Sequence, residues 1–207
     1  SCETHALGAV AALGGGLLYL LRGVWTDAAI PAVAAALCFC LSMAALYAAS
    51  AIYHYYPGTA ASGGVKRVLR KMDHSMIYVL IAGSYTPFCV VLLPQPRGTQ
   101  FCLILWGVAL AGVLAKMLWI NAPRMLSTAV YLIMGWSVVF VAKDFTALGQ
   151  PCLTLVALGG ICYSVGAVFY AVKKPNISAE WTFHELFHLL ILAGSFFHYL
   201  AVYLYVL

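Results

Sequence analysis

The sequence predicts an all-α integral membrane protein, a bundle of seven transmembrane helices. Of the 207 residues, 64% are hydrophobic and only 8% are charged, whereas a soluble domain carries about 25% charged residues. The apolar residues form seven continuous runs of roughly the 20 residues that cross a bilayer. Ala and Leu dominate these runs, and they lack the polar–apolar alternation of β-strands. We therefore expect one seven-helix domain that spans residues 1–207.

The runs follow one another with short separators that hold nearly all of the charge. The first run has the weakest signal, because it is short and contains three consecutive glycines. The fourth and fifth runs are divided by the sequence Asn-Ala-Pro at 121–123. The seven cysteines are scattered through the apolar runs, which favours packing roles over a disulfide framework. The seven predicted spans cover residues 6–22, 28–52, 73–94, 100–120, 123–143, 151–172 and 184–206.

The Lys and Arg residues are distributed unevenly between the two sides, and this predicts the orientation. By the positive-inside rule, the side with more of them faces the cytoplasm. The N-terminus is then cytoplasmic and the C-terminus lies outside. The net charge of +5 reflects these loop charges and does not indicate nucleic-acid binding. The N-terminal side carries Lys66, Arg67, Arg70, Lys71, Lys116, Arg124, Lys173 and Lys174, and the other side carries only Arg22, Arg97 and Lys143.

Several polar residues lie inside or at the ends of apolar runs, where ionisable groups are costly and indicate function. Ser50 and His54 are four residues apart near the end of the second run, so they share one helix face. His184 and His188 have the same spacing at the start of the seventh run, and Asp73 begins the third. In a seven-helix bundle these run ends fall on one side. Spacing and topology therefore place three histidines and one carboxylate in one cytoplasmic layer.

Three neutral imidazoles and one water form a tetrahedral zinc site with an open position, the pattern of catalytic zinc. Asp73 beside such a site would hold the water and take its proton. Other interpretations of single residues stay open at this point. Asp73 would also suit the N-cap of the third helix, and His54 would suit a position that faces lipid headgroups. The Ser50 hydroxyl would also suit a hydrogen bond to a carbonyl of its own helix.

The other histidines are expected to have packing or interfacial roles. His198 follows His184 by 14 residues, which is about 21 Å along a helix, so it cannot join the same metal site. His74 is adjacent to Asp73 and is expected to point elsewhere. His5 lies near the start of the first helix, also on the cytoplasmic side.

The segment HELFH also matches the H-E-x-x-H pattern of zinc metalloproteases, in which Glu185 would be the general base. A soluble protease is excluded by the composition. The longer metzincin pattern fails, because Ile191 and Gly194 occupy the positions where it needs Gly and His. No Asp or Glu follows Glu185 to act as a further ligand, which disfavours an intramembrane protease.

Three motifs in order resemble a known family across essentially all seven spans. They are S-x-x-x-H at 50–54, the segment DHSMIYVLIAGSYTPF at 73–88, and H-x-x-x-H at 184–188. The chain resembles the hemolysin III branch of the progestin and adipoQ receptor (PAQR) family, within the superfamily that includes alkaline ceramidases. The resemblance implies Zn²⁺ ligated by His54, His184 and His188, a metal-bound water held by Asp73, and Ser50 in support. It also implies a multi-pass protein of a bacterial plasma membrane.

The start of the chain departs from that family pattern. The family has an acidic residue, then an Asn, then Thr-His, whereas this chain has Cys2-Glu3-Thr4-His5 without the Asn. Glu3 and His5 are therefore given no role by the resemblance. Glu185 matches a position between the ligands that the family does not require.

The resemblance and the site together lead us to expect a zinc-dependent hydrolase that acts on a lipid amide or ester, such as a ceramide-like lipid, near the cytoplasmic leaflet. The expected partners are membrane lipids and no nucleic acid. One alternative is a membrane-state sensor in which zinc is a structural staple between the second and seventh helices. A cytolysin or an ion conductor is disfavoured, because the loops are short and acidic residues deep in the apolar runs are absent. The sequence does not specify the oligomeric state or the substrate.

Overall fold

A computed structural model describes residues 2–59, 64–145 and 149–207. These residues form helices and connecting segments without β-strands, and seven helical spans are long and apolar enough to cross a membrane. The predicted fold class is therefore confirmed. The helices are α1 (Cys2–Trp25), α2 (Ile30–Tyr55), α3 (Gly64–Pro87) with a π-helical extension η2 (Phe88–Leu92), α4 (Arg97–Leu118), α5 (Arg124–Gly135), the 3-10 segment η3 (Ser137–Val141), α6 (Ala142–Phe145), α7 (Gln150–Val172) and α8 (Phe183–Tyr205).

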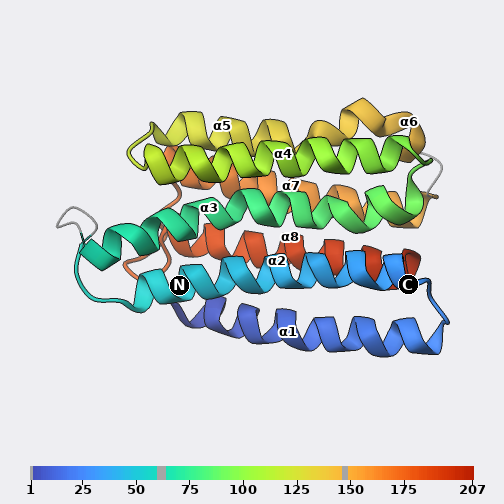
Figure 1. Ribbon diagram of the computed structural model, residues 1–207. Helices are drawn as coiled ribbons and strands as arrows, with labels where there is room; N and C mark the ends of the chain where they lie inside the picture. The colour runs from blue at the N-terminus through green and yellow to red at the C-terminus, as the bar shows by residue number, and fades with distance from the viewer. Residues whose placement is uncertain (1, 60–63, 146–148) are drawn as a thin grey trace.

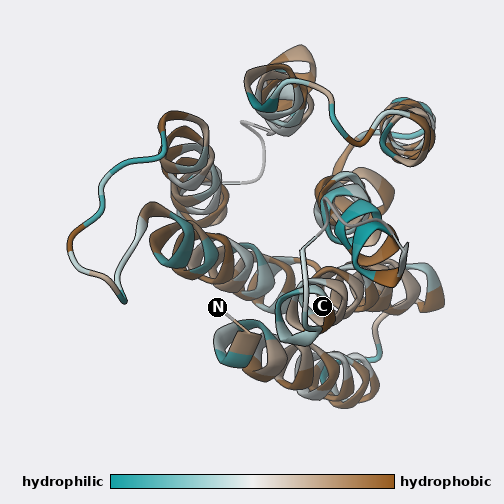
Figure 2. Ribbon diagram, turned by 90° about the vertical axis from the view of Figure 1, so that its left-hand side faces the viewer, coloured by the Kyte–Doolittle hydropathy of each residue, from teal (hydrophilic) through white to brown (hydrophobic). Residues whose placement is uncertain are grey.

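The spans run alongside one another, and their ends alternate between the two ends of the bundle (Figure 1). The start of α1, the end of α2 and the starts of α3, α5 and α8 lie at one end, while the C-terminus lies at the other. Figure 2 looks along the bundle from the first of these ends, and several near helix ends are hydrophilic. The shared layer that topology predicts for the polar motifs therefore exists in the structure.

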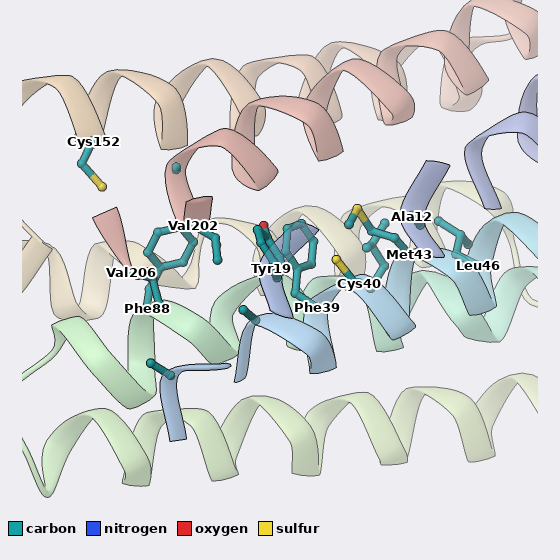
Figure 3. Close-up of a cluster of buried hydrophobic side chains, with 14 of the residues drawn as sticks. Ala12, Tyr19, Phe39, Cys40, Met43, Leu46, Phe88, Cys152, Val202 and Val206 are labelled. Carbon is teal, nitrogen blue, oxygen red and sulfur yellow. The ribbon is translucent and has the colours of Figure 1, made fainter. Parts of the chain in front are cut away.

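Helix pairs that are neighbours in sequence make the main packing contacts: α1 with α2, α2 with α3, α3 with α4, and α7 with α8. Helix α8 also contacts α1 and α3, and α5 contacts α3 and α7; all of these contacts are sparser than those of the main pairs. The larger apolar core includes the fully buried Phe39 together with Met43, Leu46 and Val202 (Figure 3). This core joins α2 to α8 and fixes the depth at which their polar residues meet.

The consecutive glycines of α1 allow close contact with α8. Tyr19 and Tyr199 stack with ring centroids 4.4 Å apart. The Tyr19 hydroxyl donates to the carbonyl of Tyr199 over 3.0 Å, and the Tyr199 hydroxyl donates to the carbonyl of Gly15 over 3.1 Å. A Cβ atom at Gly15 would lie only 2.8 Å from the Tyr199 ring. The residues that weaken the sequence signal for the first span therefore permit its docking.

The third span begins earlier than its apolar run. The run begins at residue 73, but α3 begins at Gly64 and includes the basic residues before Asp73. The amine of Lys66 donates to the carbonyls of Tyr53 and Tyr56 and lies 4.5 Å from the Tyr53 ring centroid. A cation at a helix C-terminus is favourable, so this contact ties the start of α3 to the end of α2. Asp73 consequently lies inside α3, and the N-cap interpretation of Asp73 is wrong.

The fifth span is interrupted, although the sequence predicts one run over 123–143. Helix α5 ends at Gly135, and η3 continues the span from Ser137. In a bilayer, free backbone groups must be satisfied within the protein. The phenol of Tyr85 does this, because it donates to the carbonyl of Gly135 over 2.5 Å and accepts from the Val138 amide over 3.0 Å. The break is thus supported by a side chain from α3.

We predict that the end carrying the start of α3 faces the cytoplasm, because most Lys and Arg residues lie there. A periplasmic reporter enzyme fused after Leu207 should be active, whereas the same reporter inserted after Ser178 should be inactive. Activity measured in intact cells checks this. A cytoplasmic fluorescent reporter at the same two positions serves as the control and should give the reverse result. The opposite pattern would invert the orientation.

Candidate metal centre

Three histidine side chains converge where α2 ends and α8 begins. His54 lies in the last turn of α2, and His184 and His188 lie one turn apart at the start of α8. One ring nitrogen from each lies within 4.8 Å of the other two. The Nε2 atoms of His54 and His184 are 3.1 Å apart. The structure therefore brings together the three histidines that the sequence predicts as ligands.

Local contacts hold the start of α8 and the turn before it in place. Thr182 is the N-cap of α8, and its hydroxyl accepts a hydrogen bond from the amide of His184 over 3.3 Å. The guanidinium of Arg124 donates to the carbonyl of Tyr170 over 3.0 Å and lies 4.5 Å from the ring centroid of Tyr170. It also lies 5.8 Å from the Phe183 ring. These contacts anchor the turn between α7 and α8, and with it the first histidine of α8.

The geometry fits a metal ion. In a tetrahedral centre with metal–nitrogen bonds of about 2.0–2.1 Å, ligand nitrogens lie about 3.3–3.4 Å apart. The 3.1 Å separation of two Nε2 atoms is close to this, and the third nitrogen needs only a small ring movement. Imidazole nitrogens suit zinc and other first-row transition metals. The His54, His184 and His188 cluster could therefore hold a metal ion and leave one coordination position open.

Ser50 and Asp73 form a pair beside the histidines. Ser50 is buried one turn before His54, and it lines the large cavity together with Asp73. Asp73 and His184 line the same cavity, although the Asp73 carboxylate is outside the group of potential metal ligands. A carboxylate at this position can act through a water. Ser50 and Asp73 therefore meet at the cavity wall beside the histidines.

A large cavity of about 460 Å³ extends from this site along the inside of the bundle. Its surface is mostly apolar, with Ile81, Phe88 and Leu153 among the lining residues. His184 and His198 both line it and lie 14 residues apart on α8, so the cavity is about 21 Å long by helix rise. That length exceeds the roughly 15 Å of one bilayer leaflet.

A small cavity of about 260 Å³ adjoins the large one and is polar. The two share Asp73, His74 and His184, and the small cavity is also lined by Arg70 and Arg124. It lies at the end of the bundle where α2 ends and α8 begins. The histidine cluster therefore stands at the junction between a polar opening and an apolar interior.

The remaining histidines are outside the group of candidate metal ligands, as expected. His74 lines both cavities, and its Nε2 lies 3.4 Å from the hydroxyl of Tyr170. His5 is buried and stacks on His188, which sequence reasoning missed because 183 residues separate the two. His198 is outside the metal cluster, as expected from the helix rise, and its Nε2 lies 3.1 Å from the carbonyl of Val156.

Seven helical spans and an internal polar site define a multi-pass α-helical membrane protein with a candidate metal centre. The model of the family described as "Haemolysin-III related" matches residues 2–199, and the chain belongs to this family. The family resemblance drawn from the three motifs is therefore confirmed, and it supports a plasma-membrane location.

Named relatives agree with this assignment. The chain is 38% identical to "Hemolysin-3 homolog" of Bacillus subtilis over 158 residues, which cover 76% of this chain and 70% of the relative. It is 33% identical to "Hemolysin-3" of Bacillus cereus over 207 residues, which cover 99% and 89%. It is 26% identical to human "Monocyte to macrophage differentiation factor" over 208 residues, which cover 99% and 82%. The similarity thus extends along the chain and reaches the expected PAQR-type relatives.

We predict that the purified protein carries about one transition-metal ion per chain, because three imidazoles define one site. His188→Ala should lose most of this metal, since it removes one of three ligands. His198→Ala is the matched control on the same helix and should keep it. Elemental mass spectrometry of protein prepared without chelators checks the prediction. A metal-free wild type, or equal loss in both variants, would contradict it.

Proposed function

We propose that the protein is a zinc-dependent hydrolase that cleaves a lipid amide or ester. The observation that carries this proposal is the position of the three histidines at the junction of a polar opening and a long apolar cavity. A lipid is the molecule that matches both environments. Its acyl chain would lie in the large cavity and its polar head beside His184 and Asp73.

A zinc ion bound by His54, His184 and His188 would supply Lewis-acid activation of the substrate carbonyl and of water. The Asp73 carboxylate accepts the proton of the attacking water as the water oxygen bonds to the acyl carbon. Asp73 then gives this proton to the leaving nitrogen or oxygen as its bond to the acyl carbon breaks. The Ser50 hydroxyl, which lines the same cavity, would orient the carboxylate. The apolar lining of the large cavity excludes bulk water from the acyl chain of the substrate.

One observation favours a second candidate, a membrane-state sensor with a structural metal. The three ligands come from α2 and α8, which are not among the closely packed helix pairs of the described chain. A metal there would act as a cross-link between two helices that otherwise meet mainly through side chains. Removal of the metal would then alter the packing of the helix bundle, and no catalytic activity would be lost.

The two candidates differ in what Asp73→Asn does. If the protein is a hydrolase, this variant should lower the hydrolysis rate by roughly 10²–10⁴-fold, because the proton acceptor is lost. Its metal content and melting temperature should match the wild type. A screen of amide and ester lipids, followed by mass spectrometry of released fatty acid, measures this.

Asp27→Asn is the control, because Asp27 lies at the opposite end of the bundle in a left-handed backbone conformation that Asn tolerates. It should leave the rate unchanged. Equal activity of Asp73→Asn and wild type, or no hydrolysis of any lipid by the wild type, would favour the sensor.

We also predict that Gly160→Leu shifts the preference toward shorter acyl chains. Gly160 lines the large cavity, and a Cβ atom there meets no other atom within 4 Å, so the added side chain would enter the cavity. The loss of burial for about two methylene groups corresponds to roughly tenfold weaker use of a long chain. KM values for matched short and long substrates test this.

Gly107→Leu is the matched control. Gly107 has equal space around its Cβ position and does not line the large cavity. An equal change in both variants would place the acyl chain outside this cavity.

A further inference from the structure

His5 occupies a position beside the metal centre that the proposed hydrolysis does not use. It lies in the second turn of α1 and is only 3% exposed. Its ring stacks on that of His188 with centroids 3.8 Å apart and planes inclined by 8°. On another side, the ring centroid of Tyr47 lies 5.1 Å away. His5 also lines the large cavity, so these two rings fix its imidazole at the cavity wall.

The approach of α1 to this site follows from the sequence around His5. Gly8 is one turn further along α1 on the same buried face. A Cβ atom there would lie 2.7 Å from a side-chain carbon of Leu192 on α8. At the start of α1, the Cys2 thiol lies 3.4 Å from the carbonyl of Ala51 on α2. Close packing on both sides therefore brings His5 deep into the bundle.

Both ring nitrogens of His5 lack a hydrogen-bond partner. The ring approaches the backbone of His188, but neither Nδ1 nor Nε2 makes a hydrogen bond of normal geometry with any described residue. His54 and His184 meet each other, and His74 and His198 each have one partnered nitrogen. Among the histidines of the structure, His5 is thus the one with both ring nitrogens buried and without a hydrogen-bond partner.

An imidazole is a costly choice for a purely structural ring at this position. A neutral imidazole has one donor and one acceptor, and buried polar groups are normally hydrogen-bonded. A phenylalanine would fill the same space and stack on His188 without leaving two polar atoms unsatisfied. Neither nitrogen is accessible in the present side-chain packing, but the ring lines the large cavity, so a turn of the ring would bring a nitrogen to a ligand there. The nitrogens therefore indicate a ligand with hydrogen-bonding groups.

We propose that His5 is a ligand-binding residue, which hydrogen-bonds the polar head of the lipid whose chain lies in the large cavity. The stack on His188 places this head next to the metal cluster. A lipid amide is the favoured ligand class, because it can meet either nitrogen, with its N–H at the acceptor or its C=O at the donor, whereas an ester offers only acceptors. This inference rests on the proposed lipid ligand and does not depend on hydrolysis.

The test is the binding of palmitoylethanolamide to the full chain in lipid nanodiscs. All proteins carry Asp73→Asn, so that the probe is not consumed. His5→Phe in this background keeps the stacked ring and removes the two nitrogens. We expect it to bind the amide roughly three- to tenfold more weakly, the effect of about one hydrogen bond. Metal content and melting temperature should be unchanged.

Two comparisons make the result specific. Tyr19→Phe is a control on the same helix, since Tyr19 does not line the cavity, and it should bind the amide like the parent protein. 2-Hydroxyethyl palmitate, the corresponding ester probe with the same terminal hydroxyl, should lose less affinity than the amide in His5→Phe. An equal loss of affinity for both probes would mean that His5 binds a structural water or supports the fold. That result would overturn the proposed contact with the amide head.

The outcomes for His5 and for the hydrolase are distinguishable. Amide binding that depends on His5, together with an inactive wild type, would support the His5 contact and reject the hydrolase. Equal amide affinity in His5→Phe and the parent would reject the His5 contact while leaving hydrolysis untouched. Absence of amide binding by the parent would also reject it, because His5 would then have no such ligand.

Discussion

Three imidazoles meet with one ring nitrogen each within 4.8 Å of the others inside an apolar bundle, and much of the structure serves to hold them there. Burial of a polar group without a partner costs about 1–3 kcal/mol. A shared ion satisfies several nitrogens at once and offsets this cost. Without an ion, the 3.1 Å contact between His54 and His184 can be one hydrogen bond between neutral rings, which leaves Nδ1 of the buried His188 unsatisfied. A common ligand is therefore the arrangement that accounts best for all three side chains.

The same need to give each polar group a partner recurs along the spans, where the bilayer offers no water. Tyr85 satisfies the backbone at the break after Gly135. The side-chain amide of Gln95 donates to the carbonyl of Cys89 over 2.9 Å, at the π-helical end of the third span. The Tyr85 contacts let the fifth span deviate from a regular helix without leaving these backbone groups unpaired.

The large cavity connects the polar part of the site with the apolar interior of the bundle. At one end are charged and hydrogen-bonding groups, Asp73 and Arg70 among them, and further inside are apolar walls. An amphipathic ligand placed across this boundary would have its reactive bond beside the histidines. His5 contributes to the same boundary from α1, a helix that supplies none of the three candidate metal ligands. The site is thus assembled from helices that are far apart in sequence.

The sequence alone determined the seven spans, because continuous apolar runs of this length have one stable environment. It also determined that His54, His184 and His188 would share a layer, since spacing of four residues and the alternation of helix ends are local or topological properties. The end of α2 and the start of α8 had to lie on one side in any seven-helix bundle. These parts of the site required no knowledge of packing.

Only the tertiary structure decided which other groups join that layer. Apolar composition could not show that α3 begins at Gly64, because basic residues at a helix end lower the apolar signal while they cap the neighbouring helix. That extension places Asp73 inside a helix. His5 and His188 meet through close packing of α1, which depends on small residues and shape complementarity between helices. Such contacts have no periodic signature in a chain, so their physical cause becomes visible only when the helices are packed.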